Sequence, residues 1–140
     1  MIMHVLDGTN MKLGRLASQI TKKLLQGEEV HLVNAEKLVI VGNPKQISQR
    51  YLTKRGLKHK GTPERSPKWP KLPHLLVKRM IRGMLPRDSS RGRDALKKLR
   101  VYTGNPKDLK TDLKIENAGF DGMSKHITID ELCRSMGYQG

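Results

Sequence analysis

The sequence predicts an α/β fold with a parallel sheet, and its first 34 residues carry the main observation. Residues 2–7 read as a short buried strand and Glu29–Val33 as a second one. Thr9 and Asn10 are candidate N-caps for a helix between them, and Gly27 ends that helix. The strand–helix–strand order predicts a right-handed βαβ unit. Its helix is predicted by apolar residues at helical spacing: Leu13, Leu16, Ala17, Ile20 and Leu24.

Two further helices are expected to begin at proline residues. Asn43 can cap a helix whose first position is Pro44, because proline fits there and asparagine accepts a backbone N–H. Pro73 begins another helix, which Pro86 ends. The apolar side of that helix is expected to face inward and its basic side outward: Leu76, Val77, Met80, Ile81 and Met84 against Lys78, Arg79 and Arg82.

The remaining elements are shorter. Asp88 or Ser89 is expected to cap a fourth helix that contains Ala95, Leu96 and Leu99. The apolar run 38–41 is compatible with a strand or a helix. The others are a helical turn at 34–37, a strand at 100–103, a last strand at 126–129, and a short helix from Asp130 to near Gly137.

The positive charge is concentrated in the middle of the chain. The 140 residues hold 28 Lys and Arg against 13 Asp and Glu, a formal net charge of +15. Residues 45–110 contribute 20 bases and four acids, whereas 1–44 contribute five and four, and 111–140 three and five. Such self-repulsion needs a compensating partner, so the sequence predicts a polyanion bound by residues 45–110.

The segment Gly56–Leu72 breaks every periodic pattern. Two glycines and three prolines interrupt it, and seven basic residues lie between Lys54 and Lys71. Its few apolar residues do not offset an ordering cost of about 1–2 kcal/mol per residue. We therefore expect a long basic loop that is mobile in the free protein and ordered on RNA. Trp69, its one aromatic residue, either stacks on a base or ribose or pins the loop to the core.

Several classes of protein are excluded. No apolar run approaches the roughly 20 residues of a membrane-spanning helix, and the N-terminus does not have the pattern of a signal peptide. Cys133 is the only cysteine, which excludes an internal disulfide and multi-cysteine metal sites and predicts a reducing cytoplasm. The histidines lack ligand or catalytic spacing, so we expect no catalytic residues, metal or cofactor. His59 and His74 flank basic sequence and are expected to contact phosphate.

The turn Gly8–Arg15 has the context of a phosphate-binding loop without its pattern. A Walker A loop has four residues between its glycines, followed by Lys and Ser or Thr. Here five residues separate Gly8 from Gly14, and Arg15 and Leu16 follow. A strand-to-helix glycine turn is therefore the expected role, although a helix N-terminus can also bind an RNA phosphate.

Recognition of RNA through its backbone and shape fits the composition. Only five aromatic residues are present and no RNP-like motif, so a base-stacking platform is not expected. Lys and Arg would instead contact the phosphates of structured RNA. The candidate RNA-binding residues are Lys45, Arg50, Lys54, Arg55, Lys58, Lys60, Arg65, Lys68, Trp69, Lys71, Arg79, Arg82, Arg87, Arg91, Arg93, Lys97 and Lys98.

Six segments match a known family in its own order. They are Val5–Gly8, Leu13–Ser18, Val33–Lys37, Val41–Asn43, Ile81–Pro86 and Leu99–Asn105. Together they resemble the L13 family of large-subunit ribosomal proteins over about residues 3–106. The Arg-Gly-Met-Leu-Pro block and the two Gly-Asn turns are the most specific pieces. The Gly56–Leu72 insertion and the length resemble the archaeal members.

The resemblance implies a three-layer α/β/α single domain around a mostly parallel four-stranded sheet, with the basic loop as an insertion. It implies a cytoplasmic, structural constituent of the large ribosomal subunit that binds ribosomal RNA through residues 45–110 and supports early subunit assembly. The implied partners are ribosomal RNA and neighbouring large-subunit ribosomal proteins, with no membrane, cofactor or small-molecule substrate. Nothing is implied for residues 111–140.

Two other functional classes stay open. A nucleotide-using or RNA-modifying enzyme would need a cofactor fingerprint or a clustered acid/base pair, and the sequence has neither. An RNA-binding regulator that acts outside the ribosome is also compatible with the charge distribution.

Overall fold

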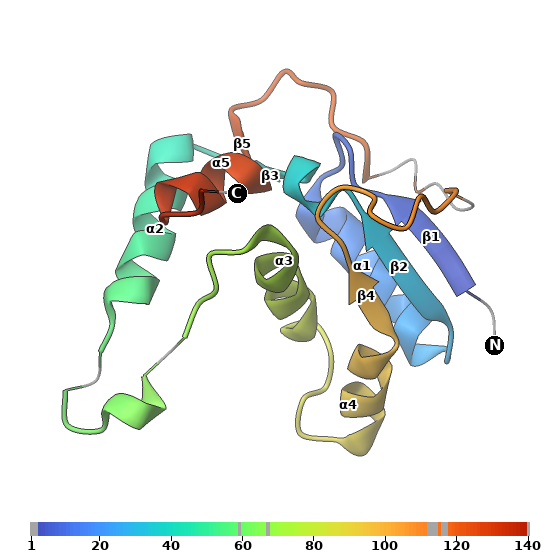
Figure 1. The fold of residues 1–140 in the computed structure, drawn as a ribbon, viewed down its shortest axis with the longest axis horizontal. Helices are drawn as coiled ribbons and strands as arrows, with labels where there is room; N and C mark the ends of the chain where they lie inside the picture. The colour runs from blue at the N-terminus through green and yellow to red at the C-terminus, as the bar shows by residue number, and fades with distance from the viewer. Residues whose placement is uncertain (1–2, 59, 67, 112–114, 116–117, 140) are drawn as a thin grey trace.

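The computed structural model describes residues 3–58, 60–66, 68–111, 115 and 118–139 (Figure 1). The predicted βαβ unit is present. β1 (Met3–Asp7) and β2 (Glu29–Val33) pair in parallel, and α1 (Leu13–Leu25) connects them and lies behind the sheet in Figure 1. β4 (Leu99–Val101) pairs in parallel with the other side of β2, so the strand order is β1-β2-β4.

A second, antiparallel pair of strands accompanies the parallel sheet. It consists of β3 (Val39–Val41) and β5 (His126–Thr128), and one parallel bridge between Lys12 and Val39 connects it to the start of α1. The α/β class is confirmed, and the apolar run 38–41 contains a strand. Within the described residues the parallel sheet has three strands, where the family resemblance implied four, because β3 takes its partner from the C-terminal part of the chain.

The helices begin largely where the sequence predicts. Asn43 Oδ1 accepts the N–H of Lys45 at 3.0 Å, and Ser89 Oγ accepts that of Gly92 at 3.3 Å. Both side chains occupy N–H groups that a helix start leaves without a partner. The remaining helical elements are η1 (Ala35–Lys37), α2 (Pro44–Gly56), η2 (Pro63–Arg65), α3 (Pro73–Arg82), α4 (Ser90–Lys97) and α5 (Ile129–Ser135).

Three helix boundaries differ from the prediction. α4 ends at Lys97, and Leu99, which was expected in that helix, is the first residue of β4. The N-cap of α1 is Lys12, because Asn10 adopts a left-handed backbone (φ 57°) and donates its side-chain amide to the carbonyl of Phe120 at 2.9 Å. α3 ends at Arg82, four residues before Pro86, because the chain leaves the helix at its C-cap, Gly83. Met84, expected on the inward face, therefore lies beyond the helix and is 46% exposed.

One core joins the sheet to the helices. Alternate strand residues Leu6, Leu32 and Leu99 are fully buried in the cluster that includes the apolar faces of α1 and α3. By contrast, α2 buries only Ile47 and projects from the body in Figure 1. The core thus fixes α3 and α4 to the sheet and leaves most of α2 in solvent.

Candidate nucleic-acid interface

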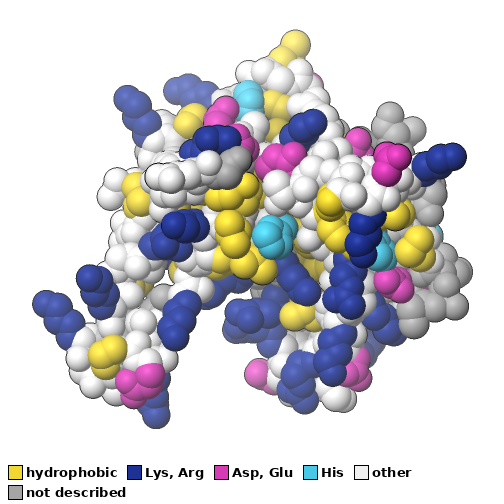
Figure 2. Space-filling view, in the orientation of Figure 1, with side chains coloured by type: hydrophobic (Ala, Val, Ile, Leu, Met, Phe, Trp, Pro, Cys, Tyr) yellow, Lys and Arg dark blue, Asp and Glu magenta, His cyan; other side chains and the backbone are white. Residues whose placement is uncertain are grey.

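Lys and Arg side chains gather on two parts of the surface with a hollow between them (Figure 2). One part is the arm, defined as α2 with the described residues of 57–66, and the other lies over α3 and α4. Among the described residues of 45–110, the structure pairs only Lys97 with a carboxylate, that of Asp94 at 4.0 Å. An exposed pair of this kind contributes little. The positive charge of this segment therefore lacks compensation within the described part of the chain.

A groove lies between α3 and α4, and we call it the α3–α4 groove. Its two halves share Arg82 and Leu96. Six basic side chains and one acid, Asp88, line the groove. The basic ones come from the segment before α3, from α3, from the α3–α4 connection and from α4: Lys68, Lys78, Arg79, Arg82, Arg87 and Arg93. The groove thus brings five of the candidate residues together, with Lys78 in addition.

Contacts within the protein hold two guanidinium groups of this groove, those of Arg79 and Arg93. Arg79 donates to the backbone carbonyl of Lys68, and its Cζ lies 4.0 Å from the centre of the Trp69 ring. Arg93 donates to the carbonyl of Arg87 at 3.3 Å. Burial, and then the nearby charges of Arg82 and Arg87, lower the pKa of Arg79 from its ordinary value. Positioned cations that repel one another are favourable for a phosphate, which would relieve the repulsion.

Trp69 pins the basic loop to the body. Its half-buried ring meets the edge of Tyr51 with ring centres 5.5 Å apart, and Lys54 Nζ lies 4.5 Å from its centre. Arg55 donates to its backbone carbonyl. Burial raises the pKa of Tyr51, against the opposing charge of Arg50. Of the two roles left open for Trp69, the structure contains the pinning one, while contact with RNA stays a prediction.

The other candidate residues are spread over the arm and α4. Lys45, Arg50 and Lys54 line a shallow groove along α2. Seven further candidates are exposed and do not line the α3–α4 groove. Five lie in or beside the arm: Arg55, Lys58, Lys60, Arg65 and Lys71. The other two, Arg91 and Lys97, lie on α4. These side chains are accessible to a large partner and make no compact site.

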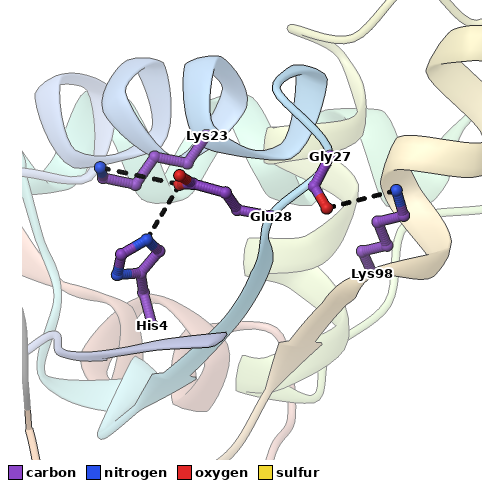
Figure 3. Close-up of polar contacts among 5 residues, drawn as sticks. All are labelled: His4, Lys23, Gly27, Glu28 and Lys98. Atoms are coloured by element: carbon purple, nitrogen blue, oxygen red, sulfur yellow. Dashed lines mark hydrogen bonds and ion pairs between the residues drawn. The ribbon is translucent and has the colours of Figure 1, made fainter. Parts of the chain in front are cut away.

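Lys98 differs from the other candidates (Figure 3). Its Nζ donates to the carbonyl of Gly27 at 3.4 Å, in the turn that follows α1. In the same region Glu28 accepts from His4 at 2.9 Å and lies 3.9 Å from the Nζ of Lys23. Lys98 therefore joins α4 to the α1–β2 turn and does not line the α3–α4 groove.

Lys78 is the groove residue absent from the candidates chosen on sequence. Burial, and then the charge of Arg100, lower its pKa from the ordinary value. Lys78 and Arg82 are four residues apart in α3 and so share one side of it, a spacing that was available as a signal. His74 Nδ1 lies 3.3 Å from Thr103 Oγ1, and His59 lies outside the described residues.

The backbone of the Gly8–Arg15 turn is occupied by the protein itself. The N–H groups of Gly8, Asn10 and Lys12 donate to the carbonyls of Val33, Lys37 and Ala118 at 2.9, 3.3 and 2.7 Å. A Cβ on Gly8 would lie 3.1 Å from the carbonyl oxygen of Asn34, so this glycine permits a close approach of two chain segments. The glycine turn is thus explained by packing, and these N–H groups do not form a phosphate cradle.

The described residues contain no cluster of three or more His, Cys, Asp or Glu side chains that could hold a metal ion. Likewise, none of the helices formed by the described residues has the length and apolar character needed to cross a membrane.

The comparison with known families decides the identity. The family model described as Ribosomal protein L13 matches residues 2–108. This chain belongs to the ribosomal protein L13 family. Similar relatives are each named large ribosomal subunit protein uL13. The one from Methanocaldococcus jannaschii is 43% identical over 96% of this chain and 98% of its own. Those from Archaeoglobus fulgidus and Aeropyrum pernix are 43% and 41% identical over 97% of this chain and 88% and 90% of their own.

The comparison confirms the resemblance and its archaeal character. The relatives also align through most of residues 111–140, for which the sequence motifs implied nothing. L13 proteins are structural ribosomal proteins and not enzymes, so this L13-family protein is a cytoplasmic component of the translation machinery.

Proposed function

We propose that this L13-family protein is a structural constituent of the large ribosomal subunit that binds ribosomal RNA through residues 45–110 and supports early subunit assembly. The observation that carries the proposal is the α3–α4 groove, where six basic side chains face a single acid. Neighbouring ribosomal proteins are the other expected partners, since the relatives are named as large-subunit proteins.

The geometry supports binding through the phosphate backbone. Two basic parts of the surface flank a hollow, and a folded RNA offers phosphates in several directions at once. The arm contributes many exposed cations on long side chains, whereas the α3–α4 groove contributes guanidinium groups that are already positioned. Positioned donors lose less side-chain entropy on binding, so we expect the groove to contribute more affinity per charge than the arm.

The experiment compares two triple substitutions with equal loss of charge. Arg82→Gln, Arg87→Gln and Arg93→Gln remove charge from the α3–α4 groove. Lys22→Gln, Lys23→Gln and Lys125→Gln remove the same charge outside residues 45–110. Affinity for deproteinised large-subunit ribosomal RNA is measured by filter binding over a range of salt, with excess transfer RNA as competitor. Circular dichroism verifies that both variants remain folded.

We expect the groove variant to lose at least about tenfold in affinity, because each lost charge-assisted hydrogen bond is worth about 1.5–3 kcal/mol. Its plot of log affinity against log salt should become shallower by about three, one for each lost phosphate contact. The control variant should change little. Equal effects of the two triple substitutions would contradict the assignment to residues 45–110.

The role in assembly has its own measurement. Depleting the protein in cells should reduce mature large subunits and accumulate lighter precursor particles on a sucrose gradient. Normal subunit profiles after depletion would remove the assembly part of the proposal and leave the RNA-binding part intact.

A further inference from the structure

The half of the α3–α4 groove that Lys68 and Pro70 line has both apolar and basic side chains. Its apolar lining residues are Pro70, Leu75 and Leu96, which we call the floor, and Leu75 is 43% exposed. Its basic lining residues are Lys68, Lys78, Arg79 and Arg82, which we call the rim. This half measures about 310 Å³, at the lower end of the range of roughly 300–1,000 Å³ found for small-ligand pockets. A ligand for it should combine a flat apolar part with negative charge close by.

The walls of this half are held in place. Arg79 connects two of the lining segments, because it belongs to α3 and donates to the backbone carbonyl of Lys68. Trp69 is the next residue after Lys68. Its ring stacks with the Arg79 guanidinium group, and its backbone carbonyl accepts a hydrogen bond from Arg55. The floor residues Leu75 and Leu96 come from α3 and the C-terminal part of α4. The pocket is therefore built from three segments of the chain and is open in the structure.

A fully paired RNA helix fits the rim but not the floor. Its outer surface is hydrated sugar and phosphate, and the faces of its bases are covered by stacking within the helix. The major groove is also too deep and narrow for side chains to enter. An unpaired nucleotide presents the two faces of its base and keeps a phosphate on either side. It thus matches both the exposed apolar floor and the surrounding cations.

We propose that the Leu75 half of the α3–α4 groove binds an unpaired RNA nucleotide, with the base on the floor and the flanking phosphates on Arg79 and Arg82. This inference rests on the proposed function. It adds that the protein prefers RNA that contains an unpaired nucleotide over fully paired RNA. The paired parts of the same RNA would contact the arm and the other half of the groove, which is lined by Arg87 and Arg93.

The test uses two RNA hairpins that differ in one nucleotide. One has a fully paired stem and the other carries a single bulged adenosine in the same stem. Fluorescence anisotropy measures the affinity of the whole protein for each, over a range of salt. Burial of one face of the adenine against the apolar floor predicts that the bulged hairpin binds roughly tenfold more tightly. The salt dependence should be the same for both hairpins, because the rim contacts phosphates of a paired stem as well as those that flank the bulge.

Matched substitutions separate the floor from the charge. Leu75→Gln makes the floor polar at an exposed position and leaves the charge unchanged. Leu52→Gln is the control, because Leu52 is 42% exposed on α2 and does not line the α3–α4 groove. We expect L75Q to lose the preference for the bulge while its affinity for the paired hairpin and its salt slope stay unchanged. L52Q should keep the preference.

The outcomes distinguish this inference from the proposed function. Equal binding of the two hairpins by the unaltered protein, or a preference that survives L75Q, would overturn the unpaired-nucleotide site and leave RNA binding in place. Weak binding of both hairpins without salt dependence, together with no binding of large-subunit ribosomal RNA, would overturn the proposed function itself.

Discussion

Gly92 is the single residue whose small size most directly shapes the candidate interface. It is buried in α4, and a Cβ at this position would lie 2.0 Å from the carbonyl oxygen of Pro86. Because that carbonyl belongs to the backbone, no rotation of a flexible side chain relieves the overlap. The missing side chain lets the α3–α4 connection fold back onto α4. As a result Arg87 and Arg93 line the same groove.

Gly92→Ala should therefore destabilise the protein. We expect a loss of about 1–3 kcal/mol of unfolding free energy, the usual cost of inserting atoms into a well-packed site. Thermal unfolding followed by circular dichroism measures it. Gly14→Ala is the matched control, since a Cβ there meets nothing within 4 Å and alanine favours the helix by up to about 1 kcal/mol. A G92A protein as stable as the G14A protein would contradict the packing argument.

Cys133 is expected to behave as a small apolar residue. Its side chain is fully buried in α5, and burial, with a lesser contribution from Asp130, raises the pKa of its thiol to about 12. Since the thiolate is the reactive form, the folded protein should resist iodoacetamide at about pH 8, whereas the urea-unfolded protein should react. Mass spectrometry reports the modification. Alkylation of the folded protein as fast as of a free cysteine would contradict this expectation.

Secondary-structure elements were predictable where local chemistry defines them. Pro44 and Pro73 occupy the first helical positions of α2 and α3, and Asn43 and Ser89 cap helices as expected. The prediction of the α1 cap was wrong because a residue far along the chain forms a hydrogen bond with the expected capping side chain. Asn10 is bound by Phe120 and so does not cap α1, although its residue type suits a cap.

The arm is the element whose order we expect to depend on RNA. Residues 60–66 are exposed or nearly so, and η2 supplies only single-turn backbone hydrogen bonds there. In hydrogen exchange, the amides of 60–66 should exchange rapidly in the free protein and become protected in the complex with ribosomal RNA. The amides of Leu76–Ile81 in buried α3 are the internal control and should be protected in both states.

The structure also limits this expectation to part of the loop. The contacts of Trp69 with Arg55, Arg79 and Tyr51 tie residues 68–69 to α2 and α3. Full protection of 60–66 in the free protein would mean that the whole segment packs on the body without RNA. In that case the prediction of a loop ordered by RNA is wrong.

At the level of the whole protein, charge asymmetry is the dominant property. Residues 1–44 hold five bases and four acids and residues 111–140 three and five, whereas 45–110 holds 20 of the 28 bases. The structure places most of the described ones on the arm, in the α3–α4 groove and on α4, and pairs only Lys97 among them with a carboxylate. Such an arrangement binds a polyanion by releasing its counterions.

Binding of structured ribosomal RNA should therefore depend strongly on salt. If about six or more phosphates are neutralised, log affinity should fall against log salt with a slope steeper than about −4. Titrations of the unaltered protein with large-subunit ribosomal RNA over a series of salt concentrations measure the slope. A slope near zero would contradict an electrostatic interface.

The α/β class, most helix starts and the basic segment could be predicted from the amino-acid sequence. These features depend on hydrophobic periodicity, capping residues and charge counts, which are local properties of the chain. The ordered family motifs added the identity, because each combines several residues at fixed spacing.

Which residues share a site depends on the three-dimensional fold and could not be predicted from the sequence. The partner of β3 comes from residues 126–128, far along the chain. The groove includes Lys78 and leaves out Lys98, which turns to Gly27. These results depend on contacts between segments that are far apart in the chain. Such contacts stabilise the fold more than the local conformational preferences of single residues do. A count of charges identifies the basic segment, and the packing of α3 and α4 on α1 and β4 determines where those charges converge.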